Sequence, residues 1–381
     1  MRYKKILFVT PRYPFPVRGG DKLRISEIMK FLSKKNSLDL ISIGKNVENK
    51  SFINKQFIFK NNFFNQSIQI LKSLIYKEPL QIGLYKVPVM KRYIDKISKN
   101  YDVIIFHLIR TTYYLPKKYN GKKILEMTDL ISKNYETVEK SLSSLNLLKY
   151  LYKYEKFSLR KYELSVFDKF DHIVFVNPKD LKTSQFKNKK KTSIIGNGAC
   201  VKQNIYFDKK FKNNIIFFGN INSLANRSAC IDFIRNYLPY IKKKYPQLEF
   251  RIIGNCSPVL KIFFNLMGVK VISNIKDLRD VSKHSLAGIC NVKIQSGLQN
   301  KVLDYSSIGL PIIVNNISNN FKFLKKTNIL VFNNVSELLI RLNSLINNST
   351  LRNKISKDNF LKTKKYYNWN KILILYSKLI K

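Results

Sequence analysis

Short, continuous runs of apolar residues alternate with segments of helical spacing from one end of the chain to the other. Six runs fall in the first half of the sequence: KILFVT, LDLISIG, DVIIFHL, KKILEMTD, HIVFVN and TSIIGNG. Six more fall in the second half: NIIFFGN, LEFRIIGN, VKVISNI, LAGICNV, PIIVNN and TNILVF. Apolar runs without polar alternation are typical of parallel strands that helices cover on both faces. The pattern therefore predicts the α/β class, with two doubly wound parallel sheets.

The length of 381 residues exceeds the size at which one hydrophobic core usually stops growing, so two domains are expected. The segment GNGACVKQNIYFDKKFKNN is polar and has no clear period, which predicts a boundary there. We place a first domain at 1–198, a linker at 199–213, a second domain at 214–358 and a C-terminal helix at 359–381. Ligands of open parallel sheets bind at the carboxyl ends of the strands, so two such sheets predict a cleft with site residues directly after strands.

The sequence contains 70 Lys and Arg against 24 Asp and Glu, a formal net charge of +46. Such a charge favours partners rich in phosphate, namely nucleic acid, an anionic membrane surface or phosphorylated substrates. The lysines are spread along the whole chain, so a compositional bias that fills solvated faces with Lys accounts for the charge as well. No recognisable nucleic-acid-binding motif is present, and no specific nucleic acid is expected as a partner.

The N-terminal stretch and the cysteines indicate the compartment. The apolar part of MRYKKILFVT is too short for a signal peptide, and no run of about 18 apolar residues could span a membrane. Cys200, Cys230, Cys256 and Cys290 are widely spaced, with no C-x-x-C pair and no nearby His. This spacing argues against zinc and predicts small buried residues in a reducing compartment, so a cytoplasmic protein is expected.

Two consecutive glycines, Gly19 and Gly20, lie between a predicted strand and a predicted helix in VTPRYPFPVRGGDKLRISEIMKFL. The first N–H groups of a helix are unpaired and its dipole favours negative charge, so glycines there let the backbone approach an anion. Asp21 fits the N-cap of the helix, and Arg24 adds positive charge. A plain glycine turn from strand to helix fits the same spacing.

Polar residues end two other predicted strands of the first half. His107 ends VIIFH, and Arg110 follows it by about one turn. A His at the carboxyl end of a strand is placed for chemistry, although a His packed at a strand terminus is the alternative. Asp129 ends KILEMTD, where an Asp often only caps the next helix.

The segment GLQNKVLDYSSIGLPIIV carries the densest signal of the second half. Its apolar residues suit a packed helix and leave Asn300, Lys301 and Asp304 available on another face. A Lys near a helix start and an Asp one turn later are the residue types that hold a phosphate and a ribose diol, whereas an exposed Lys/Asp pair is the alternative. Gly219, after the first strand of this half, allows close approach of the backbone.

Several catalytic and cofactor motifs are absent from the sequence. The G-N-G at Gly196 lacks the third glycine of a dinucleotide fingerprint, and no Walker motif or G-x-S-x-G elbow occurs. No Asp-x-Asp is present to hold a metal-bound diphosphate. Neither a metal nor a cofactor is therefore expected.

A stripe of apolar residues in the first half is interleaved with lysines. A basic, aromatic segment, KYLYKYEKFSLRKYE, follows farther along the chain. Such stripes belong either to a core with a solvated face or to an in-plane contact with a membrane. The residues of the stripe are Phe64, Ile68, Leu71 and Ile75, with Lys60, Lys72 and Lys77 between and around them.

The order of these segments resembles the two-domain glycosyltransferases of family four, in the branch common in bacterial exopolysaccharide, capsule and O-antigen clusters. PRYPFPVRGGDKLR is similar to the glycine-glycine loop of that family, YKEPLQIGLY to its second landmark, and FDHIVFVNPKDL with SIIGNGACV to the end of its acceptor domain. IIFFGNINSLANRSACIDFI resembles the start of the donor domain, GLQNKVLDYSSIGLPIIV the donor-binding helix, and NWNKILILYSKLI the closing helix that returns toward the first domain. The resemblance spans nearly the whole chain.

The sequence departs from the family pattern at three places. Ser296 stands where many members carry the first of two glutamates, and the loop GNINSLANR has only Arg227 close to where members usually have an Arg and a Lys. Asp304 stands where the family more often has Glu. These departures concern the contacts to the donor sugar.

The resemblance implies the GT-B fold, two Rossmann-like domains facing a central cleft. It also implies transfer of a sugar from a nucleotide-sugar donor to a saccharide acceptor, with retention and without metal. Carried over residue by residue, His107 lies near the reacting sugar as the catalytic residue, Lys301 binds the diphosphate and Asp304 the ribose hydroxyls. The other donor-binding candidates are Gly19, Gly20, Gly219 and Asn300, and the candidate acceptor or phosphate contacts are Arg24, Arg110 and Asp129.

The expected enzyme is cytoplasmic and peripherally associated with the inner face of the cytoplasmic membrane. There it extends a lipid-linked saccharide in surface polysaccharide synthesis. Two other functions stay open. A nucleotide-sugar epimerase on the same fold converts the free donor without an acceptor, and a non-enzymatic basic protein binds nucleic acid.

Overall fold

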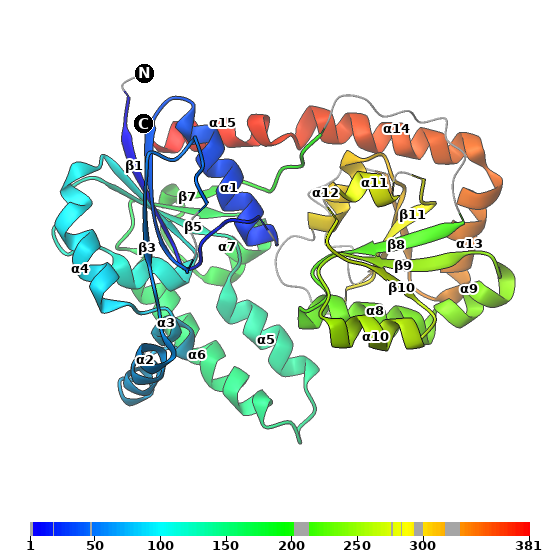
Figure 1. Ribbon diagram of the computed structural model, residues 1–381, viewed down its shortest axis with the longest axis horizontal. Coiled ribbons are helices and arrows are strands. Elements are labelled where there is room, and N and C mark those ends of the chain that lie inside the picture. Colours follow the sequence, from blue (N-terminus) through cyan, green and yellow to red (C-terminus); the bar gives the residue numbers. More distant parts are fainter. Residues whose placement is uncertain are drawn as a thin grey trace. The chain divides into compact units, whose positions relative to one another are not determined.

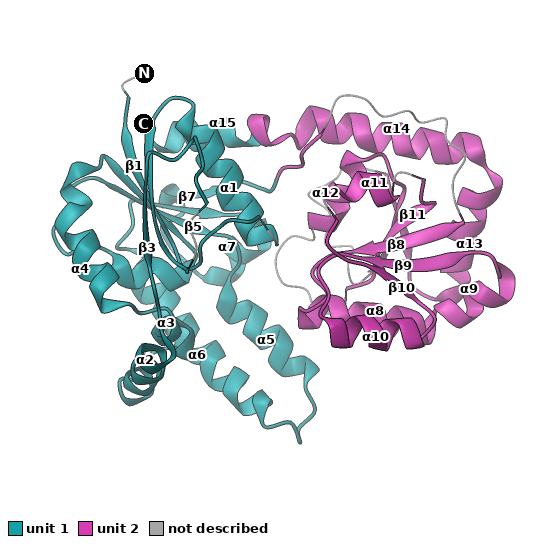
Figure 2. Cartoon of the chain, in the orientation of Figure 1, with its two compact units in different colours: residues 1–197, 296–298, 372–381 teal, residues 198–295, 299–371 magenta. Residues whose placement is uncertain are grey.

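The computed structural model describes residues 3–17, 19–45, 48–201, 213–275, 277–282, 284–292, 300–316 and 328–381. These residues form two compact units (Figure 1; Figure 2). One unit comprises the described residues of Met1–Asn197 and Ile372–Lys381, and the other those of Gly198–Gln295 and Gln299–Lys371. Residues 202–212 of the predicted linker and Ser296 lie outside the described part of the chain.

The first unit is built on a seven-stranded parallel sheet in the order β3-β2-β1-β4-β5-β6-β7. The strand order reverses between β1 and β4, where Val9 pairs with Phe106. A ligand of an open parallel sheet binds at this kind of switch point, next to the carboxyl ends of the two strands. The strands are β1 Lys5–Thr10, β2 Ser37–Ile43, β3 Lys55–Phe59, β4 Val103–His107, β5 Lys122–Met127, β6 His172–Phe175 and β7 Thr192–Ile194.

Helices lie on both sides of this sheet (Figure 1). They leave the central strands fully buried, with Leu7, Ile104 and Leu125 in one core cluster. The helices are α1 Gly20–Ser33, α2 Phe63–Ile75, α3 Leu80–Leu84, α4 Pro88–Ile97, α5 Ile131–Ser141, α6 Leu148–Phe167 and α7 Pro178–Ser184, with the short 3-10 turns η1 Ser98–Asn100, η2 Ile109–Tyr114 and η3 Lys189–Lys191. Most of α15, Trp369–Leu379, belongs to this unit as well.

The second unit has a six-stranded parallel sheet in the order β10-β9-β8-β11-β12-β13. Its strands are β8 Asn214–Phe218, β9 Glu249–Ile253, β10 Lys270–Ile272, β11 Ala287–Cys290, β12 Ile312–Asn315 and β13 Ile329–Phe332. Its helices are α8 Leu224–Asn236, α9 Leu238–Lys244, α10 Pro258–Leu266, α11 Leu278–Ser282, α12 Asn300–Ser307, α13 Val335–Asn347 and α14 Ser349–Tyr366. Helices cover both faces of this sheet too (Figure 1).

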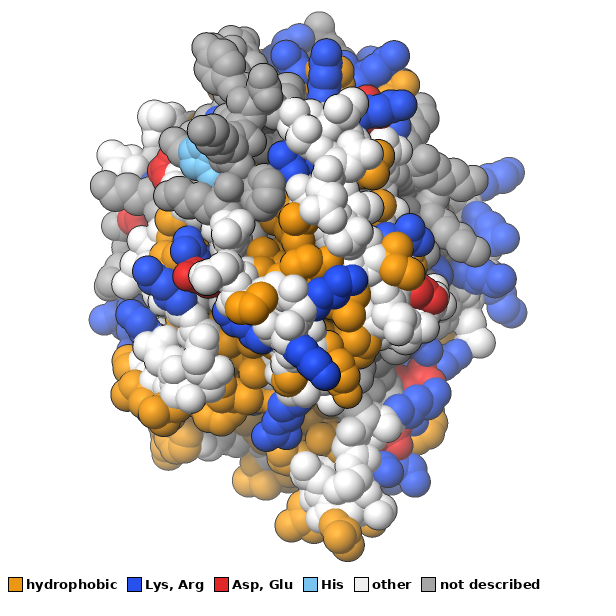
Figure 3. Space-filling view, turned by 90° about the vertical axis from the view of Figure 1, so that its right-hand side faces the viewer, with side chains coloured by type: hydrophobic (Ala, Val, Ile, Leu, Met, Phe, Trp, Pro, Cys, Tyr) orange, Lys and Arg blue, Asp and Glu red, His pale blue; other side chains and the backbone are white. Residues whose placement is uncertain are grey.

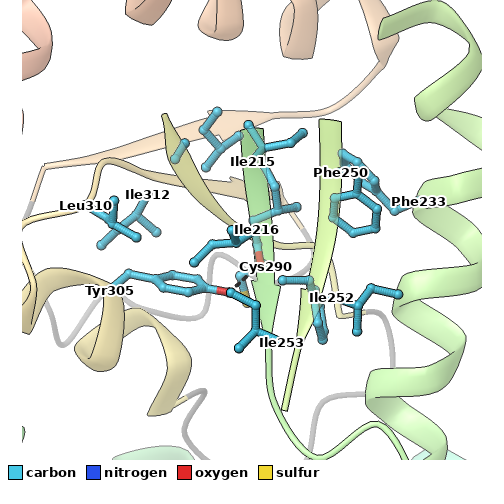
Figure 4. Close-up of a cluster of buried hydrophobic side chains, with 14 of the residues drawn as sticks. Ile215, Ile216, Phe233, Phe250, Ile252, Ile253, Cys290, Tyr305, Leu310 and Ile312 are labelled. Atoms are coloured by element: carbon cyan, nitrogen blue, oxygen red, sulfur yellow. Dashed lines mark hydrogen bonds between the residues drawn. The ribbon is translucent and has the colours of Figure 1, made fainter. Parts of the chain in front are cut away.

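Tyr305 fixes α12 against the sheet of the second unit (Figure 4). Its hydroxyl accepts a hydrogen bond from the Phe218 amide at 2.8 Å and donates to the Ile289 carbonyl at 3.2 Å. A Cβ atom on Gly288 would lie 2.4 Å from the Tyr305 ring, so position 288 has room only for glycine. The first turn of α12 is thereby held beside the carboxyl ends of β8 and β11.

The fold class predicted from the sequence is confirmed, because all twelve predicted strands are present and pair in two parallel sheets. Strand β3 was not predicted. It lies at the edge of its sheet and is only half-buried, so its sequence KQFIF has no continuous apolar run.

Two local predictions are wrong. The N-cap of α1 is Gly19, and Asp21 lies inside the first turn. Cys200 is exposed, whereas Cys230 and Cys290 are buried as expected.

The surface carries the large excess of basic residues. Figure 3 shows Lys and Arg side chains spread over the face that it draws, with few Asp and Glu among them. Within the described residues, no helix combines the length and the apolar character needed to cross a bilayer.

Candidate functional site

The first cluster of predicted site residues begins at the N-terminus of α1. Gly19 has φ 102° and ψ 158°, a backbone region that favours glycine, and a Cβ atom there would lie 3.3 Å from Asp21 Oδ1. Gly20 is the first residue of the helix. The amide of Leu23 donates to the Gly19 carbonyl at 3.0 Å, so the ladder of backbone hydrogen bonds within the helix starts at Gly19.

A carboxylate of the chain itself occupies this helix start. Asp21 pairs with Arg12 at 2.6 Å and accepts a hydrogen bond from the Lys22 amide. Burial raises the pKa of Asp21, but Arg12, His107 and the Lys22 amide outweigh burial and hold the pKa below its usual range. The position predicted for a bound anion at the two glycines is therefore next to a carboxylate of the protein itself.

His107 lies at the carboxyl end of β4 and is almost fully buried, with 3% of its surface exposed. Neither ring nitrogen has a hydrogen-bond partner among the described residues. Burial lowers the pKa of His107 to about 3; Asp21 opposes the shift, while Arg24, Arg12 and Arg110 add to it. The imidazole is neutral at pH 7 and keeps one free donor and one free acceptor.

The backbone beside His107 is strained. Leu108 has φ 67°, a conformation that non-glycine residues rarely adopt. Unusual backbone angles gather at functional sites, as do buried polar atoms without partners. Both features mark the end of β4 as a candidate site.

Asp129 and Arg110 belong to the same neighbourhood. Burial and the negative charge of Asp21 raise the pKa of Asp129 to about 6, and Arg110 opposes this shift. Arg110 donates from Nε to Gln81 Oε1 at 2.8 Å, and its guanidinium lies 5.3 Å from the centre of the Tyr85 ring. The structure thus brings His107, Asp129 and Arg110 together at the carboxyl ends of β4 and β5.

Arg24 does not fit the predicted role of an acceptor or phosphate contact. Its side chain is fully buried and pairs with Glu126 at 2.5 Å. The same guanidinium donates to the Gly196 carbonyl and to Asn197 Oδ1, each at 2.9 Å, and Tyr376 donates to the other oxygen of Glu126. Arg24 therefore ties α1 to β5, and breaking a buried pair of this kind is strongly destabilising.

The second cluster lies at the start of α12. Lys301 is 6% exposed, donates from Nζ to Asn226 Oδ1 at 2.7 Å and lies 4.2 Å from the centre of the Phe217 ring. Burial lowers its pKa, whereas Cys290, Cys230 and Asp304 oppose the shift. The alternative of an exposed Lys/Asp pair is therefore wrong for Lys301.

Asp304 is half-buried one turn after Lys301. Burial raises the pKa of Asp304 to about 7, although Lys301 opposes the shift. Asn300 is the first residue of α12 and is half-buried. The three residues that the sequence singled out thus lie on one helix, with Lys301 the most deeply buried.

Two glycines bring the backbone close together beside this cluster. A Cβ atom on Gly254, whose φ is 133°, would lie 2.0 Å from the Gly219 carbonyl oxygen. A Cβ atom on Gly219 would lie 2.8 Å from Asn226 Nδ2, and that nitrogen donates to the Asn220 carbonyl at 2.9 Å. Gly219 therefore has no room for a side chain beside Asn226, and its approach to a donor stays a prediction.

Sequence reasoning missed Asn226. This residue lies on α8, in the loop-to-helix segment that departs from the family pattern, and it joins that loop to Lys301. The sequence feature that could have identified Asn226 is the cluster of asparagines in GNINSLAN, directly after β8. Among the described residues, no group of three or more His, Cys, Asp or Glu is arranged to hold a metal ion.

Comparisons with known proteins agree with this architecture. Residues 212–348 match the family model of glycosyl transferases group 1. The whole chain also resembles solved structures. The sequence identities are low, so this likeness shows the fold alone. HepE of Anabaena in complex with UDP-glucose superposes with a TM-score of 0.66 and 11% identity over 99% of each chain.

Two further structures resemble the chain. WaaG, a glycosyltransferase involved in lipopolysaccharide biosynthesis, has a TM-score of 0.69 with 10% identity over 99% of each chain. A glycosyltransferase from Rickettsia africae has a TM-score of 0.61 with 15% identity over 100% of each chain. No curated protein matches the sequence. The second unit contains a glycosyl transferases group 1 domain, and the chain is a glycosyltransferase with the GT-B fold.

Proposed function

We propose that the enzyme takes a sugar from a nucleotide-sugar donor and that α12 holds the diphosphate of this donor. The observation that carries the proposal is Lys301, a buried amine in the first turn of α12 within the matched domain. Asn226 fixes its Nζ at 2.7 Å. A helix start and an adjacent ammonium together favour a phosphate group.

In this proposal the protein itself stabilises the charge that develops on the leaving diphosphate. Lys301 donates to a diphosphate oxygen, and the close pair of Gly219 and Gly254 lets the backbone approach the donor. Asp304 accepts hydrogen bonds from the ribose hydroxyls. The transfer proceeds with retention and without a metal ion, as the family resemblance implies.

His107 is the proposed contact to the reacting sugar. Its two ring nitrogens have no hydrogen-bond partner within the described part of the chain and the imidazole is neutral, so it can exchange hydrogen bonds with a sugar hydroxyl without carrying charge. Arg110 and Asp129 are the proposed acceptor contacts, because the charge of Arg110 acts on both His107 and Asp129. Arg24 has no part in this proposal.

The proposed acceptor is a lipid-linked saccharide at the inner face of the cytoplasmic membrane, in surface polysaccharide synthesis. The net charge of +46 supports a peripheral association with anionic lipid. The role of WaaG in lipopolysaccharide biosynthesis supports the class of product.

Donor binding to Lys301 is tested by isothermal calorimetry with a panel of nucleotide sugars and the free nucleoside diphosphates. We expect Lys301→Ala to weaken binding of the preferred donor by about tenfold to a hundredfold, since a charged hydrogen bond contributes about 1.5–3 kcal/mol. Lys270→Ala, which removes an exposed lysine of the same unit, is the matched control and should bind like the wild type. Equal affinities of all three proteins would remove Lys301 from the donor site.

The alternative of an epimerase is tested by incubating the preferred donor without any acceptor. A glycosyltransferase leaves the donor sugar unchanged or slowly hydrolyses it. An epimerised nucleotide sugar in the product mixture would show that the enzyme converts the free donor. This result would overturn the proposed transfer.

A further inference from the structure

Helix α2 is amphipathic, but its polar side chains face the protein and its apolar side chains face outward. Its buried residues are Gln69 and Ser73. One turn earlier on the same face, Asn65 donates from Nδ2 to the Lys86 carbonyl at 2.9 Å. These residues are spaced by four, so a polar stripe is the inner face of the helix.

Tight packing against α3 fixes this orientation. A Cβ atom on Gly83 would lie 2.4 Å from Ser73 Oγ and 2.8 Å from the Gln69 carbonyl oxygen. The absence of a side chain at Gly83 therefore lets the polar stripe lie directly on the backbone of α3. Rotation of α2 would replace this fit with bulky aromatic side chains.

The apolar stripe that the sequence predicted on this helix consequently faces outward. Phe63 is 83% exposed, although a surface helix ordinarily buries such residues against the core. Exposed apolar groups of this size mark an interaction surface. The exposed large apolar residues of α2 and its end are Phe63, Phe64, Ile68, Leu71, Leu74, Ile75 and Tyr76.

A second apolar element projects from the same side of the first unit, the turn between α5 and α6 (Figure 1). Leu145 in this turn is 93% exposed, and Leu147, Tyr150 and Leu151 are exposed as well. Helix α6 is tied to α3, since the Glu155 carboxylate accepts from the amides of Leu80 at 2.5 Å and Gln81 at 3.1 Å. Both apolar elements are thus anchored on α3. We name them together the α2–α6 face.

The charges around this face are mainly positive, since the nearby acids Glu78 and Glu139 pair with Lys86 and Lys156. Helix α2 contains no acidic residue, and Lys60, Lys72 and Lys77 lie within it or close to its ends. Helix α6 contains two acids, Glu155 and Glu163, and both are buried. The exposed charged side chains of α6 are cations, namely Lys153, Arg160 and Lys161.

We infer that the α2–α6 face is a docking surface for an anionic lipid bilayer, with α2 lying in the plane of the interface. Outward apolar side chains enter the acyl boundary while flanking lysines contact the headgroups, which is the composition of an interfacial helix. A second copy of the chain is disfavoured as the occupant because two faces of like charge repel. The inference deepens the membrane part of the proposed function and rests on it. It is measured without any sugar, so its failure leaves the proposed transfer untouched.

Vesicle sedimentation at 0.15 M salt tests the inference. We expect binding to vesicles of about 70% phosphatidylcholine and 30% phosphatidylglycerol, and much weaker binding to pure phosphatidylcholine. The triple variant Phe63→Ser/Phe64→Ser/Leu71→Ser should lower the partition coefficient by more than about tenfold. Lys60→Gln/Lys72→Gln/Lys77→Gln should lower it roughly a hundredfold, because each lysine near an anionic surface contributes about fivefold. Unchanged partitioning of the apolar triple variant would overturn the inference.

Helix α10 offers a matched control, because it also exposes apolar side chains but has a single lysine, Lys261. Val259→Ser/Ile262→Ser/Leu266→Ser removes a comparable apolar surface from the second unit and should leave vesicle binding unchanged. A loss equal to that of the α2 variant would show that binding follows total apolar exposure, and it would overturn the assignment to α2. Thermal melts of both triple variants check that each is folded.

Insertion is measured through Phe64→Trp and lipids brominated in their acyl chains. The chain has one Trp, and Trp369 is buried in the second unit, so it gives the baseline. We expect bromine to quench the new indole and to leave the emission of the wild type nearly unchanged. No quenching of a vesicle-bound variant would show adsorption by charge alone and contradict in-plane insertion.

Light scattering without lipid distinguishes the other occupants. We expect a monomer. A wild-type dimer that becomes monomeric in the α2 triple variant, with no vesicle binding by either, would assign the face to a second copy and overturn the lipid inference.

Discussion

His107 combines three conditions at the scale of a single residue: burial, a neutral ring and two ring nitrogens without partners among the described residues. A His that only packs at a strand end normally satisfies one ring nitrogen, because an unpaired buried polar group costs about 1–3 kcal/mol. The two unpaired nitrogens therefore favour a site residue over a merely packed His. Lys301 has the complementary character, a buried amine fixed by a single amide.

The pH dependence of stability tests the state of His107. Its folded pKa of about 3 lies below the usual value of 6.5, so between these values the unfolded chain binds the proton and the folded chain does not. Stability supplied by the neutral ring is complete above pH 6.5 and is lost as pH falls toward 3. Relative to His107→Gln, the wild type should lose about 1.4 kcal/mol per pH unit in that range.

Urea denaturation of both proteins at pH 7 and pH 5 gives this difference. The comparison with His107→Gln is needed because the buried carboxyls act in the opposite direction. Burial raises the pKa of Glu163 to about 7, for example, so that group favours the folded state at lower pH. Equal losses in the wild type and the variant would mean that His107 is accessible to protons in the folded state.

The residue types at the candidate site could be predicted from the sequence, but their surroundings could not. His107 stands out because it ends a predicted strand, and Lys301 because it lies near the start of a predicted helix. Arg24 pairs with Glu126, which also accepts a hydrogen bond from Tyr376, and no spacing rule reports a network of residues so far apart in the chain. Asn226 was missed for the same reason.

At the scale of elements, the two glycines at the start of α1 differ in backbone conformation. Only Gly19 has a positive φ, so the two positions should respond differently to substitution. Gly19→Ala should lower the free energy of unfolding by about 1 kcal/mol or more, because an L-residue disfavours this conformation. Gly20→Val should fold normally and lose sugar transfer, because a branched side chain would block the approach to the helix amides.

Circular dichroism melts measure the stability of both variants, and transfer assays measure their activity. If Gly20→Val unfolds, the pair of glycines is a plain turn and has no role at the site.

Helix α12 depends on Tyr305 for its position. Tyr305→Phe removes the hydroxyl that pairs with the Phe218 amide and the Ile289 carbonyl, and both groups lose this partner. We expect the free energy of unfolding to fall by about 1–3 kcal/mol. Chemical denaturation measures the change, and a variant as stable as the wild type would show that water replaces the hydroxyl.

Elements with continuous apolar runs were predictable, since burial on both faces of a parallel sheet leaves that pattern. The edge strand β3 was not predictable, because its residues are only half-buried and leave no continuous apolar run. The orientation of α2 was also undecided by its sequence. The spacing of Phe64, Ile68 and Leu71 is the same for an inward and an outward stripe, and only packing of Gly83 on Ser73 selects between them.

At the scale of the whole molecule, the chain is a glycosyltransferase whose second unit contains the matched domain. The net charge of +46 is compatible with three kinds of partner, namely nucleic acid, an anionic membrane surface and phosphorylated substrates. The structure adds that cations border an outward apolar helix, which singles out lipid among them for the proposal. Specific nucleic-acid recognition would need a reading motif in addition to charge.

Transfer itself is the most direct test of the account. Purified protein is incubated with each of a panel of radiolabelled nucleotide sugars and a lipid extract, with Lys301→Ala and Lys270→Ala alongside. We predict that one donor labels the lipid-linked saccharide fraction, that the product retains the anomeric configuration, and that Lys301→Ala alone loses the signal. Neither transfer nor hydrolysis of any donor by the wild type would contradict the account.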